Sequence, residues 1–255
     1  MTAGFQAIVL AAGKGARMKS ELPKVLLPLA GKPVIFRILD LLAEVGIPRP
    51  VVVIGKSGDL VKKTLGDRCV YAVQDEQLGS GHAVMCAREA AGDAKNILVM
   101  CGDSPLFRAE TVRSLMSAHV RGNATITLVS AMLDDPTGYG RIIRAPDGEI
   151  AGVIEEKLAS GDQKTIREIN GGLYAFDGAW LWGNAHLMLE SDAGEFCLTE
   201  MVDIAISQER RVITVPASPD EVAGINTPEQ LLAAERVLLG RGDKGTRRRG
   251  DKGTR

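Results

Sequence analysis

The residues with the clearest potential for chemistry form a glycine-containing run near the start of the sequence. This run is Leu10-Ala-Ala-Gly-Lys-Gly-Ala-Arg-Met18, and Leu22-Pro-Lys-Val25 follows it. Glycine tolerates left-handed dihedrals and carries no side chain, so backbone N–H groups near Gly13 and Gly15 can converge on phosphate oxygens. Arg17 and Lys24 can then neutralise a triphosphate. The whole run indicates a phosphate-binding loop, although Gly13-x-Gly15 alone fits an ordinary strand-to-helix turn equally well.

Two other phosphate-binding motifs can be tested by their spacing. A dinucleotide-binding fingerprint needs a third glycine, and Met18 stands at that position. A Walker A loop ending in Gly55-Lys56-Ser57 needs a glycine where Pro50 stands. Neither motif is satisfied.

A single carboxylate follows another predicted strand. Asp103 comes directly after the apolar run Ile97 to Cys101, at the sheet edge where open α/β folds bind ligands. A carboxylate in that position can hold a hard cation such as Mg²⁺, with phosphate oxygens and water completing the coordination shell. Most single aspartates in loops are turn residues, so the position alone leaves both interpretations open.

The elements that must position these residues alternate between strand and helix in the first half of the chain. Short apolar runs predict buried strands, and amphipathic segments between them predict helices. The predicted strands are 5–10, 51–54, 70–73, 97–101 and 125–131, and the predicted helices are 33–45, 81–91 and 109–119. This order predicts an α/β fold with a Rossmann-like, mostly parallel sheet and helices on both faces.

The second half of the chain follows a different pattern. Runs 141–144 and 149–154 flank the turn-forming Pro146-Asp147-Gly148, which predicts a hairpin. We predict further strands at 172–176 and 211–216, helices at 179–189 and 199–207, and a last helix from Thr227 to Leu239 that ends at Gly240. We therefore expect a mixed sheet in one domain of residues 1–240. Residues 241–255 are basic, repetitive and poor in apolar side chains, so we expect a disordered tail.

Composition excludes several functional classes. The chain has 255 residues, a net charge of -1 and 45% hydrophobic residues, which argues against a nucleic-acid partner and against disorder. No apolar stretch approaches the roughly 20 residues that span a bilayer, and residues 1–6 lack the pattern of a secretory signal. We therefore expect a soluble cytoplasmic protein with no membrane partner. Its four cysteines form no Cys-x-x-Cys pair and its three histidines show no metal-ligand spacing, so we interpret both as structural.

Several segments together resemble a known family. The glycine run and Lys24 look like the uridylyltransferase half of the bacterial bifunctional GlmU enzymes, which make UDP-N-acetylglucosamine. Matching segments follow in order over nearly the whole chain: Gln74, Gln77-Leu-Gly-Ser-Gly-His-Ala83, Gly102-Asp103, Gly138-Tyr-Gly-Arg141, Glu155-Glu-Lys157, Glu168-Ile-Asn170, Leu198-Thr-Glu200 and Gly224-Ile-Asn226. So many ordered matches are highly specific, and they imply the nucleotide-diphospho-sugar transferase fold.

The resemblance also implies roles for individual residues. It assigns Asp103 and Asn226 as ligands of a catalytic Mg²⁺, and Arg17 and Lys24 as the catalytic cations. Implied nucleotide-binding residues are Leu10, Ala11, Ala12, Gly13, Lys24, Gln74, Gly79 and Ser80, with backbone near Gly81. Implied sugar-binding residues are Gly140, Glu155 and Asn170. The implied substrates are UTP and N-acetylglucosamine 1-phosphate, and the implied products are UDP-N-acetylglucosamine and pyrophosphate.

The sequence also departs from the family pattern. The resemblance ends near Leu239, and no left-handed β-helix acetyltransferase domain follows, so we expect no acetyltransferase activity and leave the oligomeric state open. Ser80 and Gly171 each stand where threonine is usual, beside implied ligand positions. Another sugar 1-phosphate, an alcohol phosphate or another base is therefore an alternative. A non-catalytic sugar-nucleotide-binding subunit is a second alternative, which the retained Arg17, Lys24, Asp103 and Asn226 argue against.

Overall fold

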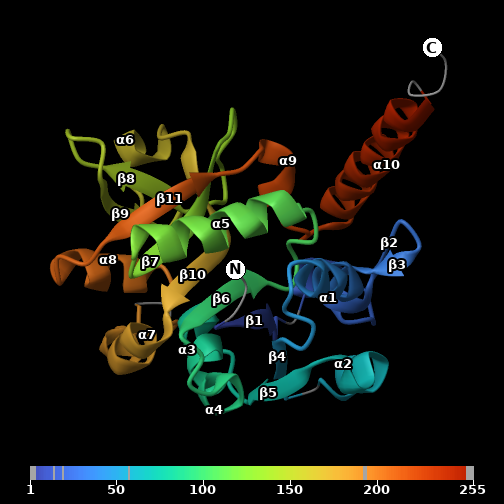
Figure 1. The fold of residues 1–255 in the computed structure, drawn as a ribbon, viewed down its shortest axis with the longest axis horizontal. Helices are drawn as coiled ribbons and strands as arrows, with labels where there is room; N and C mark the ends of the chain where they lie inside the picture. Colours follow the sequence, from blue (N-terminus) through green and yellow to red (C-terminus); the bar gives the residue numbers. More distant parts are fainter. Residues whose placement is uncertain (1–3, 14, 19, 57, 192–193, 251–255) are drawn as a thin grey trace.

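A mixed β-sheet forms the centre of the molecule (Figure 1). The computed structural model describes residues 4–13, 15–18, 20–56, 58–191 and 194–250, with the side chains of Ala16 and of 242–250 excepted. The strand order in the main sheet is β11-β7-β10-β6-β1-β4-β5, and β8 joins β10 to β9. Strands β6, β1, β4 and β5 are mutually parallel, and β11 is parallel to β7. Only β10 runs antiparallel to β6 and β7 within that order. The prediction of a mostly parallel mixed sheet is confirmed.

Most main-sheet strands lie close to their predicted positions, but the strand predicted at 172–176 begins at Glu168. The main-sheet strands are β1 (Phe5–Ala11), β4 (Val51–Gly55), β5 (Val70–Gln74), β6 (Asn96–Cys101), β7 (Ile126–Met132), β8 (Arg141–Arg144), β9 (Ile150–Ile154), β10 (Glu168–Asp177) and β11 (Val212–Pro216). A separate two-stranded sheet pairs β2 (Pro28–Leu29) with β3 (Lys32–Pro33). The hairpin predicted around Pro146-Asp147-Gly148 is present as antiparallel β8 and β9.

Helices cover both faces of the sheet because successive strand side chains point to opposite sides. Ala7 and Val9 of β1 belong to one core and Ile8 to the other. The first core includes side chains of α1 (Val34–Glu44), α2 (Asp59–Leu65), α5 (Ala109–Gly122) and α9 (Pro219–Val222). The second includes side chains of α3 (Gly79–Cys86), α4 (Arg88–Ala91), α7 (Gly178–Asn184) and α8 (Glu200–Ser207). The short α6 (Gly161–Lys164) follows β9.

Several helices differ from the predictions. Helix α2 was missed, because its seven residues bury only Val61 and Leu65, which is too little for a periodic signal. The predicted helix 81–91 is two helices, because the N–H of Ala87 bonds to Val84 O and makes a tight turn that no glycine or proline marks. The segment 179–189, predicted as one helix, consists of α7 followed by a 3₁₀ turn, Ala185–Leu187.

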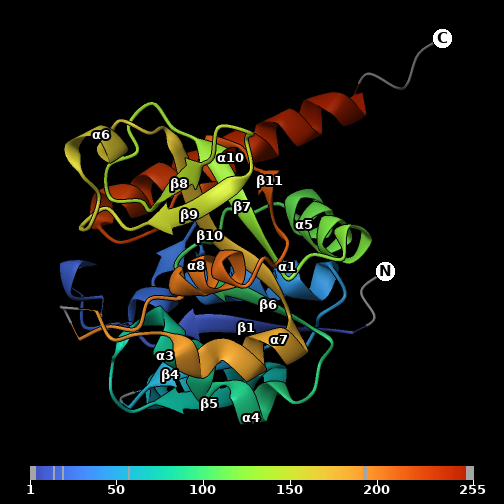
Figure 2. The same ribbon diagram turned by 90° about the vertical axis from the view of Figure 1, so that its left-hand side faces the viewer.

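The last helix, α10 (Pro228–Gly250), is longer than predicted and extends away from the sheet (Figures 1 and 2). The predicted end at Gly240 is wrong. Arg241 Nη1 donates a hydrogen bond to Leu106 O at 2.7 Å, which ties the first residue of the expected tail to the body. Once a helix is nucleated, each added residue gains a backbone bond, so a helix can continue without apolar burial. Residues 251–255 of that tail lie outside the described residues.

No helix within the described part of the chain has the length and apolar character that crossing a membrane requires.

Candidate nucleotide-binding site

A cavity of about 310 Å³ lies at the edge of the sheet where β1, β5 and β6 end. Strand β1 pairs in parallel with β6 and β4, and β4 pairs in parallel with β5, so the carboxyl ends of all these strands meet at one edge of the sheet. The cavity is lined by Asp103 and by the predicted nucleotide-binding residues with the exception of Gly81, whose N–H bonds to Phe196 O. The full lining of the cavity is Leu10, Ala11, Ala12, Gly13, Lys24, Val25, Gln74, Gln77, Gly79, Ser80, Ala83, Cys101, Asp103 and Glu195.

The loops around this cavity pack closely enough to require glycine at two positions. Gly102 N donates to Leu10 O at 2.8 Å, and a Cβ on Gly102 would lie only 2.8 Å from that same oxygen. Gly79 has φ +95°, and a Cβ there would lie 2.5 Å from Phe196 O. A side chain at either position would push the strand-end loops apart. Lys14 of the glycine run lies outside the described residues.

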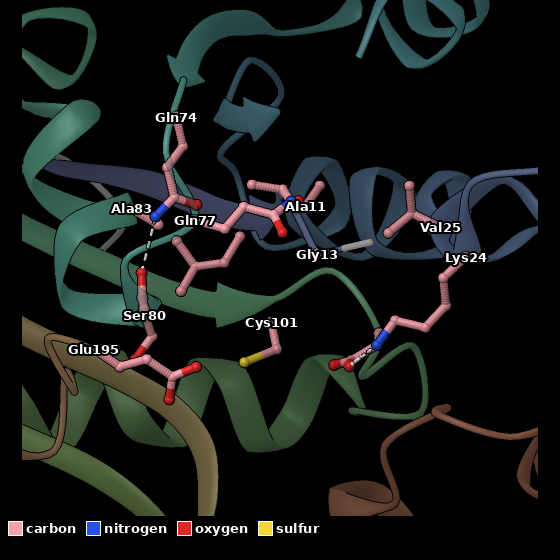
Figure 3. Close-up of a pocket in the computed structure, with 14 residues that line it drawn as sticks. Ala11, Gly13, Lys24, Val25, Gln74, Gln77, Ser80, Ala83, Cys101 and Glu195 are labelled. Atoms are coloured by element: carbon pink, nitrogen blue, oxygen red, sulfur yellow. Dashed lines mark hydrogen bonds and ion pairs between the residues drawn. The ribbon is translucent and has the colours of Figure 1, made fainter. Parts of the chain in front are cut away.

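One end of the cavity carries amide and hydroxyl groups. The Gln74 side chain is buried, and its Nε2 donates to Gly79 O at 3.0 Å (Figure 3). This bond uses the amide nitrogen of Gln74, so the amide oxygen can accept a hydrogen bond from an N–H group of a ligand. Ser80 Oγ accepts from Leu198 N at 3.0 Å, which fixes α3 to the loop before α8.

The other end carries charge. Lys24 Nζ forms an ion pair with Asp103 and donates to Asn226 Oδ1 at 3.0 Å. Arg17 is exposed, and its Nη2 donates to the same Asn226 oxygen at 3.3 Å. Ile225 N donates to Asp103 O at 2.9 Å, so the loop after β6 and the loop before α10 are bound to each other. Residues separated by more than 200 positions thus meet at one point.

The oxygens at this point suit a hard cation. Asp103 and Asn226 both direct an oxygen at the single ammonium group of Lys24, so two oxygen donors converge where a cation is already accepted. The described residues contain no cluster of three or more His, Cys, Asp or Glu that could hold a metal. Mg²⁺ is often bound by one or two protein oxygens, with substrate phosphates and water completing its shell. The donor set therefore fits Mg²⁺ bound together with a phosphorylated ligand.

A thiol also faces the cavity, and it is not set up as a nucleophile. Cys101 lies between Ser80 and Lys24 in Figure 3. Burial, reinforced by the charge of Asp103, raises the pKa of the Cys101 thiol to about 12. The thiolate is the nucleophilic form of cysteine, so Cys101 is a neutral group near neutral pH.

The three predicted sugar-binding residues lie near one another but outside the lining of this cavity. Asn170 N donates to Gly140 O at 2.9 Å. The Asn170 side chain donates to the Tyr174 hydroxyl and accepts from Gly172 N at 3.1 Å. Glu155 Oε1 accepts from Thr199 Oγ1 at 2.9 Å and lines a second cavity of about 460 Å³. Glu195 lines both cavities and so marks where they adjoin.

Sequence reasoning assigned no role to several residues that build these walls. Gln77, in the loop between β5 and α3, donates a hydrogen bond from Nε2 to Ala12 O and so holds the glycine run against this loop. Phe196 bonds through its backbone to Leu78 O and to Gly81 N, both at 2.8 Å. Gln77 lies inside a matched motif, so its role was open to prediction. The pairing of Phe196 with residues more than 100 positions earlier leaves no local sequence signal.

Two of the three histidines, all of which we expected to be structural, make contacts within the protein. His119 is buried, its Nδ1 lies 3.0 Å from Thr127 Oγ1, and burial lowers its pKa to about 4. His186 is exposed. His82 Nδ1 lies 3.1 Å from both Gln74 Nε2 and Glu76 O, so this ring helps to hold the Gln74 amide in place.

Comparison with known proteins agrees with this arrangement of loops and strands. A family model described as the MobA-like NTP transferase domain matches residues 7–149, which is more than half of the chain. The chain belongs to this family. A solved structure assigned as a glucose-1-phosphate thymidylyltransferase of Bacillus anthracis, in complex with sucrose, superposes with a TM-score of 0.76. The superposition covers 91% of this chain and 94% of the other, at 20% sequence identity, so the likeness shows a shared fold.

Similar curated proteins are named bifunctional protein GlmU. The one from Heliobacterium modesticaldum is 46% identical over 240 residues, and the one from Geobacillus thermodenitrificans is 40% identical over 239 residues. The one from Exiguobacterium sp. is 42% identical over 248 residues. These alignments cover 92%, 92% and 96% of this chain but 52%, 52% and 55% of the relatives. The chain therefore spans about half the length of these relatives, and it contains a nucleotidyltransferase domain similar to theirs.

Proposed function

We propose that the protein transfers a uridylyl group from UTP to N-acetylglucosamine 1-phosphate, in a magnesium-dependent reaction that releases pyrophosphate. The observation that carries this proposal is the cavity at the end of β1, β5 and β6. It brings the glycine run, Gln74, Lys24 and Asp103 around one space of about 310 Å³. The GlmU name of the similar proteins supports the choice of substrates.

The reaction needs no protein nucleophile. A phosphate oxygen of the sugar phosphate attacks the α-phosphorus of UTP, and a new P–O bond forms. The bond from the α-phosphorus to the oxygen that bridges to the β-phosphate breaks, and pyrophosphate leaves with that electron pair. The attacking oxygen is already negatively charged, so the protein must mainly align the two phosphates and stabilise charge. The neutral Cys101 thiol is consistent with such a direct transfer.

Each group at the cavity has a task in this scheme. Backbone N–H groups of residues 10–13 bind phosphate oxygens, and the Gln74 amide oxygen accepts the N3–H of uracil. Asp103 and Asn226 would hold Mg²⁺, which when bound offsets negative charge on the phosphates. Lys24 and Arg17 stabilise the charge that develops on the departing pyrophosphate, because preorganised cations cost no reorganisation during the reaction.

The sugar would occupy the side of the cavity toward Glu195, where the second cavity begins. Glu155, Asn170 and Gly140 are the proposed sugar-binding residues. Carboxylate and amide groups suit recognition of hydroxyl and acetamido groups. The Asn170 amide is bonded to Tyr174 and Gly172, so binding a sugar through this side chain requires it to exchange at least one of these bonds. A cytoplasmic location is part of the same proposal.

A pyrophosphate-release assay tests the proposal directly. Purified protein is mixed with each of four nucleoside triphosphates and with several sugar 1-phosphates, with and without Mg²⁺. We expect the highest kcat/KM for UTP with N-acetylglucosamine 1-phosphate, and no release after chelation of Mg²⁺. Absence of pyrophosphate release with every pair would overturn the proposed reaction and favour a non-catalytic binding subunit.

A further inference from the structure

The buried Arg141 stands where three strands meet that contain or directly adjoin the proposed sugar-binding residues. Arg141 begins β8, and its register partners are Ile154 on β9 and Ile169 on β10. Both neighbours run antiparallel to β8. Gly140 therefore precedes Arg141 at the same edge where Glu155 follows Ile154 and Asn170 follows Ile169. The three proposed sugar-binding residues therefore lie side by side, with Asn170 within β10 and the other two just outside the ends of β8 and β9.

The Arg141 side chain is unusual among the charged groups of this protein. It is the largest side chain in the described structure that is fully buried, at 1% exposure. A buried guanidinium is costly unless it is paired and hydrogen-bonded. Its Nη2 lies 2.6 Å from Glu156 Oε2, and its Nη1 donates to Tyr139 O. Nη2 also approaches Lys164 O at 3.5 Å.

These partners belong to the loops that carry the proposed sugar site. Tyr139 is the neighbour of Gly140, and Glu156 is the neighbour of Glu155. The Glu156 carboxylate also accepts from the Gly138 backbone, and the Arg141 hydrogen bond lowers the pKa of Glu156 from its usual value. The planar guanidinium presents several donors in a fixed fork, so one side chain can bridge a carbonyl and a carboxylate at once.

We propose that Arg141 is a positioning residue for sugar recognition: its guanidinium, paired with Glu156, holds the 138–140 and 155–156 loops in the spacing that binds the sugar phosphate. This inference rests on the proposed function and adds to it a residue that itself need not touch the substrate. The glycine run, Gln74 and Lys24 are built on other strands. Loss of the Arg141 contacts should therefore weaken binding of the sugar phosphate while leaving UTP binding intact.

Steady-state kinetics on three variants test this split. Arg141→Lys keeps the positive charge but loses the planar guanidinium with its several donors. Glu156→Gln removes the ion pair by changing Glu156, the more exposed of the two partners. Arg144→Met is the matched control. Arg144 lies on the same strand and pairs with Glu168 at 2.6 Å, three residues from the sugar-site edge. We expect Arg141→Lys and Glu156→Gln to raise KM for the sugar phosphate by about tenfold to a hundredfold, because small misplacements of positioning groups have effects of that size. KM for UTP should change by less than about twofold, and Arg144→Met should resemble the wild type.

Binding and stability measurements separate the possible outcomes. Ligand-detected NMR with N-acetylglucosamine 1-phosphate in the presence of a non-hydrolysable UTP analogue should show weaker binding to both variants, whose melting temperature is recorded in parallel. Equal increases in KM for both substrates, or an unchanged sugar KM in a folded Glu156→Gln variant, would overturn the positioning role while the proposed reaction stands. If the wild type neither binds nor turns over any sugar phosphate, the proposed function itself is wrong. Should Arg141→Lys fail to fold, Glu156→Gln alone decides the question.

Discussion

The two sides of the proposed active site are built in different ways. The nucleotide side consists of loops that directly follow parallel strands β1, β5 and β6, and their predicted residues line one cavity. The sugar side consists of residues at the ends of antiparallel β8, β9 and β10, and the side chains of Glu155 and Asn170 already have partners within the protein. The cavity on the nucleotide side is thus preformed in this structure, with Lys24, Asp103 and Asn226 paired to one another at its charged end. The sugar side must exchange internal bonds to bind through the side chains of Glu155 and Asn170.

This difference has an energetic consequence for binding. A preformed site loses little conformational freedom when a ligand binds, whereas a site that exchanges hydrogen bonds recovers only the difference between old and new contacts. Changes on the nucleotide side should therefore affect turnover strongly. Changes on the sugar side should affect mainly the sugar KM.

The largest effect is expected at Asp103, at the charged end of the nucleotide side. Asp103→Ala removes one of the two proposed magnesium ligands and the ion-pair partner of Lys24. Loss of one charge-stabilising group typically lowers kcat by a factor of about 100 to 1,000. The measurement is the Mg²⁺-dependent rate of pyrophosphate release, with circular dichroism to verify the fold. Asp59→Ala, at an exposed carboxylate on α2, is the control. Near-normal turnover in a folded Asp103→Ala variant would refute the metal assignment.

The next effect concerns the base and depends on Gln74. The amide oxygen of Gln74 suits the N3–H of uracil, whereas cytosine presents an acceptor at that position. An unmatched buried polar group costs about 1–3 kcal/mol, so kcat/KM for UTP should exceed that for CTP by about tenfold to a hundredfold. Gln74→Leu should abolish most of this preference. A CTP preference in the wild type, or an unchanged preference in Gln74→Leu, would show that the base is recognised elsewhere. A dTTP preference would contradict only the choice of UTP, because thymine presents the same N3–H.

A smaller effect is expected on the sugar side. Glu155→Gln keeps the shape of the side chain and its contact with Thr199 but removes the charge, so KM for N-acetylglucosamine 1-phosphate should rise by about tenfold, roughly the loss of one charge-assisted hydrogen bond. KM for UTP should not change. Glu149→Gln, at an exposed position of the same hairpin, is the control. A higher kcat/KM for glucose 1-phosphate than for N-acetylglucosamine 1-phosphate would contradict the sugar assignment but not the reaction class.

The smallest effect is expected at the C-terminal end of α10, which lies far from both sides of the site (Figure 1). We expect truncation after Arg241 to leave kcat, both KM values and the melting temperature unchanged, because residues 242–255 have no apolar side chains to bury. Truncation after Gly240 also removes the Arg241 contact with Leu106 O, so comparing the two truncations measures that contact. A large loss of activity in the protein truncated after Arg241 would show that residues 242–255 act on the site.

The sequence by itself determined the alternation of strands and helices along the first half of the chain, the mixed character of the sheet and the position of the glycine run after the first strand. These features are local: each loop follows its own strand, and the carboxyl ends of parallel strands meet at one edge by geometry. Glycine at 79 and 102 could be interpreted as loop residues from their neighbours alone. The prediction that the glycine run and Asp103 lie at one edge of the sheet followed from this rule, whereas Gln74 was assigned to the same site by the resemblance to the GlmU enzymes.

Only the tertiary structure decided how the distant parts combine. The contact of Lys24 with both Asp103 and Asn226, the pairing of Phe196 with Gly81 and the strand register that places Arg141 between Ile154 and Ile169 all join residues far apart in the sequence. A one-residue shift in register would turn every side chain of a strand to the opposite face, and no local pattern in a four-residue strand such as β8 specifies that register. The division between a preformed nucleotide side and an internally bonded sugar side therefore follows from the packing of β8, β9 and β10, because their side-chain partners are chosen only when the strands assemble.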